Sequence, residues 1–527
     1  MSTEEIINIE NEIDEAFGKS ELLKLGYSQA VWTLLSVVED HHFKIRVYNP
    51  LDDNGQSIYV DGLINALTYP LQICHKNASV TNNKFSRGLV DKHYSQSNEW
   101  IDRAEDYTHF CSIFPLYHNE EIDIQVSGDT LITTDWSAYD LSYEVYDRFV
   151  AMRHSESEVC SDPNTIAPLI FLNTTVKGDS FTLNFTPTLV KQLSDHLEHM
   201  YNTRFSLPES WKFKHFSIGE FKLVFTAIQS MVYGWFIARQ IGCQKGISAL
   251  GYKSALWTPG KAELISRLSR YTGLDKEKVT IIVGYLTFGD AGIRNPDVAI
   301  QPIIDLKNGE LALSSLVWLN VNCERNLCVL LNQINEEKKI YSKLVNEKEE
   351  KLRDEIVSKL DVLGYDFKYG QIGNTDVDLA VIDRKNKKCL TIELKWFIEP
   401  AEIREVIQRS KEVKKGVLQA NKVQDAWKRK DRRLVEQLLD IDESYELLAV
   451  VAPVNSIGNL SAQDGVTPVI KTWHLISEIL DKKDLGIVIE WLMSRNYLPK
   501  KDVDYKIKST EIKSGKWNST WYGISYA

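Results

Sequence analysis

Cysteine is scarce in this 527-residue chain, and the seven cysteines are scattered without one Cys-x-x-Cys pair, so neither a disulfide framework nor a structural zinc site is expected. Apolar runs are short as well, and none approaches the roughly 18 residues that span a membrane. The best candidate, Ser230–Ile241, contains Arg239 and predicts a buried helix. The acidic N-terminus lacks the basic-then-apolar pattern of a secretion signal. These absences predict a soluble, cytoplasmic protein with no membrane partner.

Positive charge is also in deficit, because 62 Lys and Arg face 73 Asp and Glu, giving a formal net charge of −11. An acidic chain has no general attraction to nucleic acid or anionic membranes, so any such binding requires a local basic patch. The motifs G-x-x-x-x-G-K-[ST] of P-loop NTPases and G-x-S-x-G of serine hydrolases do not occur. The 43% share of hydrophobic residues is typical of a folded globular protein.

Local patterns divide the chain into three regions. Residues 1–205 mix short helical and strand-like runs, which predicts an α+β region of unknown role. Residues 206–340 are mainly helical and include a β-hairpin around Lys307-Asn308-Gly309. Residues 341–527 alternate strand and helix patterns, and highly charged residues mark the boundary near 340. The expected fold class is α/β (α+β), with a C-terminal mixed sheet flanked by helices.

The most informative segment is residues 373–397. Two apolar-rich runs, 377–383 and 389–397, flank the polar turn 384–388, which predicts a β-hairpin. A symmetric turn fixes which residues lie opposite each other, and side chains alternate faces along each strand. The predicted cross-strand pairs are Asp383–Lys388, Asp378–Glu393 and Asp376–Lys395.

The predicted pair of Asp378 and Glu393 has a physical consequence. Cβ atoms of directly opposite residues lie about 4.5–5.5 Å apart, and like charges at that spacing destabilise a sheet. A hard divalent cation such as Mg²⁺, held by carboxylates, backbone carbonyls and waters, would supply the missing charge. The carbonyl of Leu394 is a candidate further ligand. Lys395 is placed to stabilise negative charge on an attacked phosphate or to orient the water nucleophile.

Asp378, fourteen intervening residues and the run Glu393-Leu394-Lys395 together resemble the PD-(D/E)XK phosphodiesterase superfamily, whose members share the restriction-endonuclease-like fold. The resemblance covers about 25 residues, and Val377 stands where the family motif has proline. It implies that Asp378 and Glu393 hold Mg²⁺ or Mn²⁺ and that Lys395 is catalytic. It also implies in-line attack by a metal-activated water, without a covalent intermediate.

The same resemblance implies two further catalytic side chains on the helices around the hairpin. A helix expected at 347–363 ends at Gly364, and in this family it often supplies an acid. The helix after the lysine often carries a glutamine, and here Gly416 would allow a close backbone approach. The candidates are Glu349, with Glu355 as the alternative, and Gln419, with Gln408 as the alternative. Plain surface roles for these residues stay open.

A local basic block begins in the hairpin turn. Residues 384–433 hold sixteen Lys and Arg and only seven Asp and Glu, within an otherwise acidic chain. Lys and Arg release condensed counterions from a phosphate backbone, so nucleic-acid binding requires such a block. A solvated helix face is the alternative interpretation. The candidate nucleic-acid-binding residues are Lys411, Lys414, Lys415, Lys428, Arg429 and Lys430.

Together these observations predict a metal-dependent nuclease domain at the C-terminus, with DNA as the expected substrate. The architecture is similar to that of bacterial restriction or anti-phage effectors, in which the remaining chain serves recognition, regulation or oligomerisation. A homodimer or a partner subunit is compatible with it. One alternative is an inactive nucleic-acid-binding or sensor protein on the same fold. Another is a chance match of the motif within an ordinary α/β domain.

Overall fold

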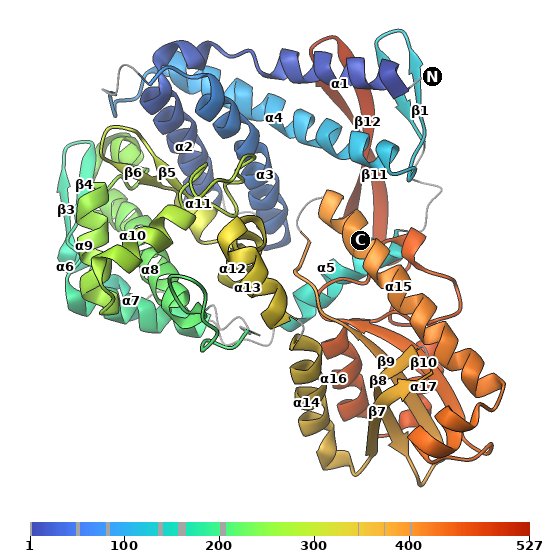
Figure 1. Ribbon diagram of the computed structural model, residues 1–527. Coiled ribbons are helices and arrows are strands. Elements are labelled where there is room, and N and C mark those ends of the chain that lie inside the picture. The colour runs from blue at the N-terminus through green and yellow to red at the C-terminus, as the bar shows by residue number, and fades with distance from the viewer. Residues whose placement is uncertain are drawn as a thin grey trace. The chain divides into compact units, whose positions relative to one another are not determined.

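The protein is described by a computed structural model that covers residues 3–48, 53–80, 85–134, 141–155, 165–200, 207–345, 347–373, 375–400 and 403–526 (Figure 1). Two compact units are present, and each combines segments that are distant in sequence. Unit 1 comprises Met1–Phe110, Glu158–Ser342 and Lys513–Trp517. Unit 2 comprises Cys111–Ser157, Lys343–Ile512 and Asn518–Ala527.

This division differs from the three regions expected from the sequence. The change of unit between Ser342 and Lys343 lies beside the expected boundary near 340, but no change of unit occurs at residues 205–206. Residues 111–157 instead belong with the C-terminal segment. Within unit 2, the Tyr146 hydroxyl lies 2.7 Å from Nδ1 of His474. Such a contact joins residues more than three hundred positions apart, so no local pattern could predict it.

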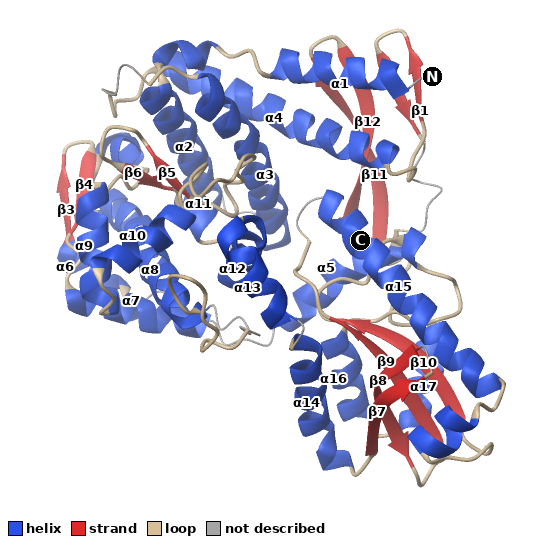
Figure 2. Ribbon diagram, viewed as in Figure 1, coloured by secondary structure: helices blue, strands red, loops and turns tan. Residues whose placement is uncertain are grey.

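Helices make up most of unit 1 (Figure 2). The helices that lie or begin in it are α1 (Thr3–Phe17), α2 (Tyr27–Phe43), α3 (Asp53–Asn77), α4 (Asp91–His118), α6 (Ala167–Asn173), α7 (Pro187–Met200), α8 (Ile218–Gln244), α9 (Lys261–Thr272), α10 (Lys276–Tyr285), α11 (Ser315–Trp318), α12 (Cys323–Gln333) and α13 (Asn335–Val345). Its antiparallel strand pairs are β3 (Thr174–Lys177) with β4 (Ser180–Leu183), and β5 (Ile303–Asp305) with β6 (Leu311–Leu313). The hairpin predicted around Lys307-Asn308-Gly309 is the β5–β6 pair.

Helix α8 is the one helix among the described residues that is long and apolar enough to cross a membrane, and 72% of its most apolar stretch is buried inside the protein. It contains the expected buried helix at Ser230–Ile241. Its Arg239 is fully buried, and the guanidinium donates to the Asp40 carboxylate at 2.9 Å and to the Leu250 carbonyl at 3.0 Å. A buried charge needs such partners. The burial and these bonds are those of a core helix.

Unit 2 holds the segment with the predicted hairpin. Its helices are α5 (Ser142–Ser155), α14 (Lys348–Leu360), α15 (Ile403–Lys428), α16 (Thr472–Lys482) and α17 (Leu485–Ser494). Its main strands are β7 (Asp366–Ile372), β8 (Thr375–Asp383), β9 (Lys388–Lys395) and β10 (Glu446–Pro453). A second sheet, in the order β1-β2-β12-β11, is formed by β1 (Ile124–Ser127), β2 (Thr130–Thr133), β11 (Tyr505–Ser514) and β12 (Trp517–Tyr526).

The main sheet of unit 2 has the strand order β10-β9-β8-β7. Strand β10 runs parallel to β9, whereas β7, β8 and β9 are antiparallel to one another, so the sheet is mixed. The fold is therefore α+β, with a C-terminal mixed sheet flanked by helices, and this confirms the expected fold class. The strand expected at 466–470 is reduced to an isolated bridge between Val469 and Val451.

Apolar side chains fill both faces of this sheet. On one face, Leu379, Ile392 and Val450 belong to the core that contains the apolar sides of α14, α16 and α17. On the other face, Ile382 and Cys389 pack with the second half of α15. Figure 1 shows the sheet between α14 and α16 on one side and α15 on the other. The two central strands, β8 and β9, are thus held in register by packing on both faces.

We expect Ile392→Ala to destabilise unit 2 by roughly 2–5 kcal/mol, because Ile392 is 1% exposed and its truncation leaves a cavity between β9 and the helices. The control is Ile487→Ala on α17, where the same side chain is 52% exposed and the loss should stay within about 0.5 kcal/mol. Urea unfolding of both variants measures the difference. Equal losses would contradict the assigned core.

Candidate active site

The hairpin forms in the predicted register. Strands β8 and β9 pair from Asp383 opposite Lys388 to Leu379 opposite Ile392. The Asp383 carboxylate accepts the backbone N–H of Asn386 at 3.0 Å, which closes the turn. The next positions in this register are Asp378 and Glu393, directly beyond the end of the ladder that lies away from the turn. The two carboxyl groups are close enough for the charge of Asp378 to raise the pKa of Glu393.

The β8–β9 ladder ends at Leu379 and Ile392, so it includes neither the predicted pair Asp378–Glu393 nor the predicted pair Asp376–Lys395. On its other side, β8 pairs Asp376 with Gln371 of β7. A local hydrogen bond lies where the β8–β9 ladder ends. The Asp378 side chain accepts the backbone N–H of Leu394 at 2.8 Å, so this donor of β9 bonds a side chain at the point where the ladder stops.

Lys395 and Glu393 form a close ion pair, with Nζ and Oε1 2.5 Å apart. Glu393 is 5% exposed, and its neighbour on the other side is Val451 of β10. The lysine is partly buried, and burial alone would lower its pKa. The negative charges of Glu393, Glu349 and Asp378 outweigh burial and raise the pKa of Lys395 above its ordinary value, so the amine stays charged.

The two facing carboxyl groups both hold protons more tightly than usual. Burial raises the pKa of Asp378 to about 6, against the opposing effects of the Leu394 N–H and of Lys395. Burial and the charge of Asp378 raise the pKa of Glu393 to about 7, although Lys395 lowers it. One lysine therefore does not compensate two buried carboxylates. Perturbed pKa values of this kind are concentrated at functional sites.

Helix α15 packs its backbone directly on this group. A Cβ atom added to Gly416 would lie 3.4 Å from Cε of Lys395 and 3.6 Å from Cγ of Glu393, and only 3.0 Å from a methyl group of Val451. The expected close approach at Gly416 agrees with this geometry. Gln419 lies one turn further along the same helix and is partly exposed. Within the described residues no hydrogen bond joins it to Glu393 or Lys395.

The structure distinguishes between the two candidates for the helix acid, Glu349 and Glu355. Glu349 of α14 is close enough for its charge to raise the pKa of Asp378 and of Lys395. Glu355 is exposed and lies 3.8 Å from Lys359. The geometry therefore favours Glu349 as the helix acid. Gln408 is exposed, two turns before Gly416.

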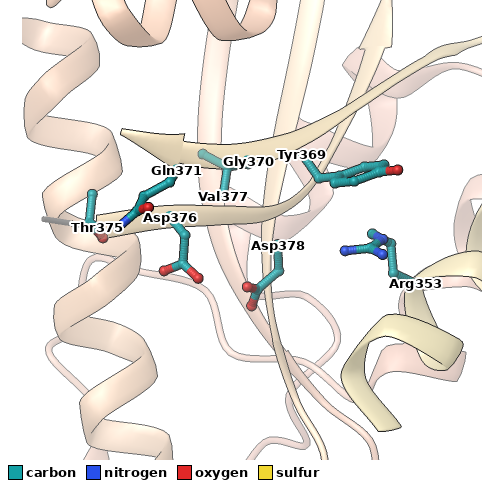
Figure 3. Close-up of a pocket in the computed structure, with 8 residues that line it drawn as sticks. All are labelled: Arg353, Tyr369, Gly370, Gln371, Thr375, Asp376, Val377 and Asp378. Carbon is teal, nitrogen blue, oxygen red and sulfur yellow. The ribbon is translucent and has the colours of Figure 1, made fainter. Parts of the chain in front are cut away.

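A cleft of about 460 Å³ opens beside Asp378. Figure 3 shows the carboxylates of Asp376 and Asp378 on the same side of β8, with Arg353 of α14 across from Asp378. Tyr369 of β7 forms part of the wall. Arg353 and Tyr369 were missed by sequence reasoning. Arg353 follows Glu349 by four residues, and this helical spacing could have identified it.

The donor set fits a hard divalent cation in its chemistry. Carboxylate and carbonyl oxygens are the ligands of Mg²⁺ and Mn²⁺, and Asp378, Glu393 and the carbonyl of Leu394 supply this type. The raised pKa values show that negative charge here lacks full compensation. In the part of the chain that the structure describes, no three His, Cys, Asp or Glu side chains form a metal-binding group. Waters or substrate oxygens would have to complete the shell.

The candidate nucleic-acid-binding residues are exposed, on α15 and directly after it. They fall into two groups, residues 411–415 beside Gly416 and residues 428–430 at the end of the helix. Several have polar partners: Lys411 bonds Asn119 at 3.0 Å, and Lys415 and Lys430 form ion pairs with Glu412 and Glu443. Lys414 and Arg429 have no ion pair among the described residues.

No protein-family model, curated protein or solved structure matches this chain. The comparisons therefore identify no PD-(D/E)XK domain. The functional argument rests on the geometry around Asp378, Glu393 and Lys395.

Ionisation of the two carboxyl groups should destabilise the fold. Their pKa values are raised on folding, so stability should fall as pH increases from about 4 to about 7 and then level off. Asp378→Asn keeps an oxygen for the Leu394 N–H but removes one charge. We expect it to reduce this loss by roughly 1–3 kcal/mol. Urea unfolding in EDTA across this pH range measures it.

The control for this experiment is Asp361→Asn, which removes an exposed carboxylate in the same unit. Its stability should vary with pH as that of the wild type does. Identical pH profiles for Asp378→Asn and the wild type would contradict the electrostatic account.

Proposed function

We propose that this protein is a metal-dependent nuclease that hydrolyses phosphodiester bonds, in DNA above all, through a PD-(D/E)XK-like site in unit 2. The observation that carries this proposal is the facing pair of Asp378 and Glu393, with a charged Lys395 bonded to Glu393, beside an open cleft. Two buried carboxyl groups with raised pKa values cost folding stability. A purely structural role would not explain why the chain has this destabilising pair.

Mg²⁺ or Mn²⁺ would be held by Asp378, Glu393 and the carbonyl of Leu394. When bound, the ion supplies Lewis-acid stabilisation of the phosphate and lowers the pKa of a coordinated water. The remaining chemistry belongs to side chains of this chain. Lys395 keeps its positive charge and is held by Glu393, ready to stabilise negative charge that develops on the phosphate.

The neighbouring elements restrict this group. The Leu394 N–H orients Asp378, and the backbone of α15 at Gly416 packs on Lys395 and Glu393, which limits their rotamers. Preorganisation of this kind lowers the reorganisation needed during reaction. Glu349 of α14 adds a carboxyl group near Asp378 and Lys395, where it can orient a water. Gln419 is proposed as a second polar group for the same task.

The exposed Lys and Arg of α15 support a polyanionic substrate, and DNA is the proposed polymer. A cytoplasmic location follows as a proposal from the soluble character of the chain. Unit 1 would provide recognition, regulation or oligomerisation, through a homodimer or a partner subunit. By analogy of architecture alone, we propose a role in bacterial restriction or anti-phage defence.

The second candidate is an inactive nucleic-acid-binding or sensor protein on the same fold. One observation favours it: among the described residues, the two facing carboxyl groups lack a third acidic side chain in metal-binding geometry. Binding without metal-dependent cleavage would be its signature.

Lys395→Ala should abolish cleavage, by at least about a hundredfold, because the charge that stabilises the attacked phosphate is lost. Asp378→Asn should lose cleavage as well. The assay uses plasmid, linear DNA and RNA with Mg²⁺, Mn²⁺ or EDTA, and it measures nucleic-acid binding in parallel. The matched control is Lys385→Ala, which removes an exposed lysine from the turn of the same hairpin and should retain activity. Full activity of Lys395→Ala would rule out the proposed site.

Lys414→Ala should weaken DNA binding at all sequences alike. Removing one phosphate contact reduces the slope of log binding constant against log salt concentration by about 0.9 for duplex DNA. Fluorescence anisotropy from 50 to 200 mM salt measures this slope. Lys508→Ala, an exposed lysine of β11 outside the basic block, is the control and should leave the slope unchanged. An unchanged slope for Lys414→Ala would exclude this part of α15 from the interface.

A further inference from the structure

The cleft beside Asp378 continues away from the carboxylates to an aromatic ring (Figure 3). At that end, the Arg353 guanidinium lies 3.9 Å from the ring centre of Tyr369. Tyr369 is nevertheless 54% exposed, so the guanidinium covers one face of the ring and leaves other surface open. A cation over one face holds the ring in place. The result is a fixed aromatic platform a short distance from the proposed reaction centre.

The backbone explains why this ring is presented outward. The pairing of β7 with β8 shifts register between Lys368 and Gly370, on either side of Tyr369. Gly370 has φ of 149°, a conformation that side-chain-bearing residues rarely adopt. A bulge of this kind re-aims a side chain and is over-represented beside active sites. The strand is thus built to turn Tyr369 toward the cleft.

Two polar atoms in the cleft wall have no hydrogen-bond partner among the described residues. They are Nε of Arg353 and Oγ1 of Thr375, and both atoms are buried. The exposed carboxylate of Asp354 lies 3.5 Å from Nε, without hydrogen-bond geometry. Buried donors without partners are uncommon in folded proteins. Thr375 lies at the far end of the cleft, beyond Asp376 and Asp378 (Figure 3). The Arg353 guanidinium lies beside Tyr369 and is 18% exposed, and a guanidinium is suited to phosphate oxygens.

We propose that this cleft binds one unstacked nucleotide next to the scissile phosphate, and that the preferred substrate is therefore single-stranded or locally unpaired nucleic acid. Tyr369 stacks on the base, and Arg353 donates to the phosphate. The proposal rests on the proposed nuclease function and specifies its substrate class.

The preference for unpaired strands follows from the stacking platform. In a duplex both faces of a base are covered by its neighbours, so a side-chain ring reaches only a base that has left the stack. Stacking on an aromatic ring tolerates any base, so the subsite selects strand state and not sequence. The cleft volume of about 460 Å³ lies in the range of sites for single small molecules, roughly 300–1,000 Å³. It matches one nucleotide.

The test compares the binding of one labelled oligonucleotide, single-stranded or annealed to its complement, to the full-length protein by fluorescence anisotropy in EDTA. Tyr369→Leu removes the ring, and Tyr369→Phe keeps it. We expect the leucine variant to lose roughly 5- to 100-fold in affinity for the single strand and less than about twofold for the duplex, while the phenylalanine variant binds as the wild type does. Arg353→Met should weaken single-strand binding and lower its salt slope by about 0.7. Thermal unfolding of each variant verifies that it is folded.

Three outcomes would overturn the proposal: no binding of either form by the wild type, unchanged single-strand binding by Tyr369→Leu, or an equal loss for single strand and duplex. None of these readouts requires cleavage. The failure of catalysis in the wild type therefore contradicts the nuclease function alone, whereas cleavage that does not depend on Tyr369 contradicts the subsite alone.

Discussion

The site in unit 2 depends on one unfavourable interaction, the repulsion between the carboxyl groups of Asp378 and Glu393 on neighbouring central strands. Burial increases the cost, because water no longer screens the two charges. Lys395 and the Leu394 N–H offset part of it, but burial and the remaining repulsion still raise the pKa of both carboxyl groups. A fold keeps such a pair only where the surrounding packing holds it in place.

That packing comes from both faces of the sheet. The apolar residues of β8 and β9 bury against α14, α16 and α17 on one side and α15 on the other, so neither strand can slip to separate the charges. Gly416 adds a local constraint, because the α15 backbone occupies the space into which Lys395 and Glu393 would otherwise turn. The stability of the sheet thus maintains the repulsion between the two carboxyl groups at the ends of its central strands, and a cation can relieve it.

The sequence predicted the features that depend on neighbouring residues or on the regular alternation of side chains along a strand or helix. The turn after Asp383 is short and polar, so the register of the hairpin could be counted from it, and Gly364 ends the helical segment in the left-handed conformation as expected. Counting from the turn does not show where the pairing of β8 with β9 stops, because the Leu394 N–H bonds the Asp378 side chain there and strand alternation cannot reveal such a bond. Contacts between residues that are far apart in the sequence were not predicted. The bond between Tyr146 and His474 and the cleft formed by Arg353 and Tyr369 each need two segments to be placed by the fold.

The charge distribution resolves an apparent conflict in the site. A pair of carboxylates repels phosphate, so an acidic centre cannot hold a polyanion without positive charge around it. Here the positive groups come from different elements: Lys395 from β9, Arg353 from α14, and Lys414 with its neighbours from α15. The strand would be held by phosphates on either side of the reacting one, while the centre itself keeps its negative charge for a cation. Under the proposed function, the overall acidity of the chain would favour selectivity, because a polyanion would be attracted to the basic block of residues 384–433 and repelled by the acidic remainder.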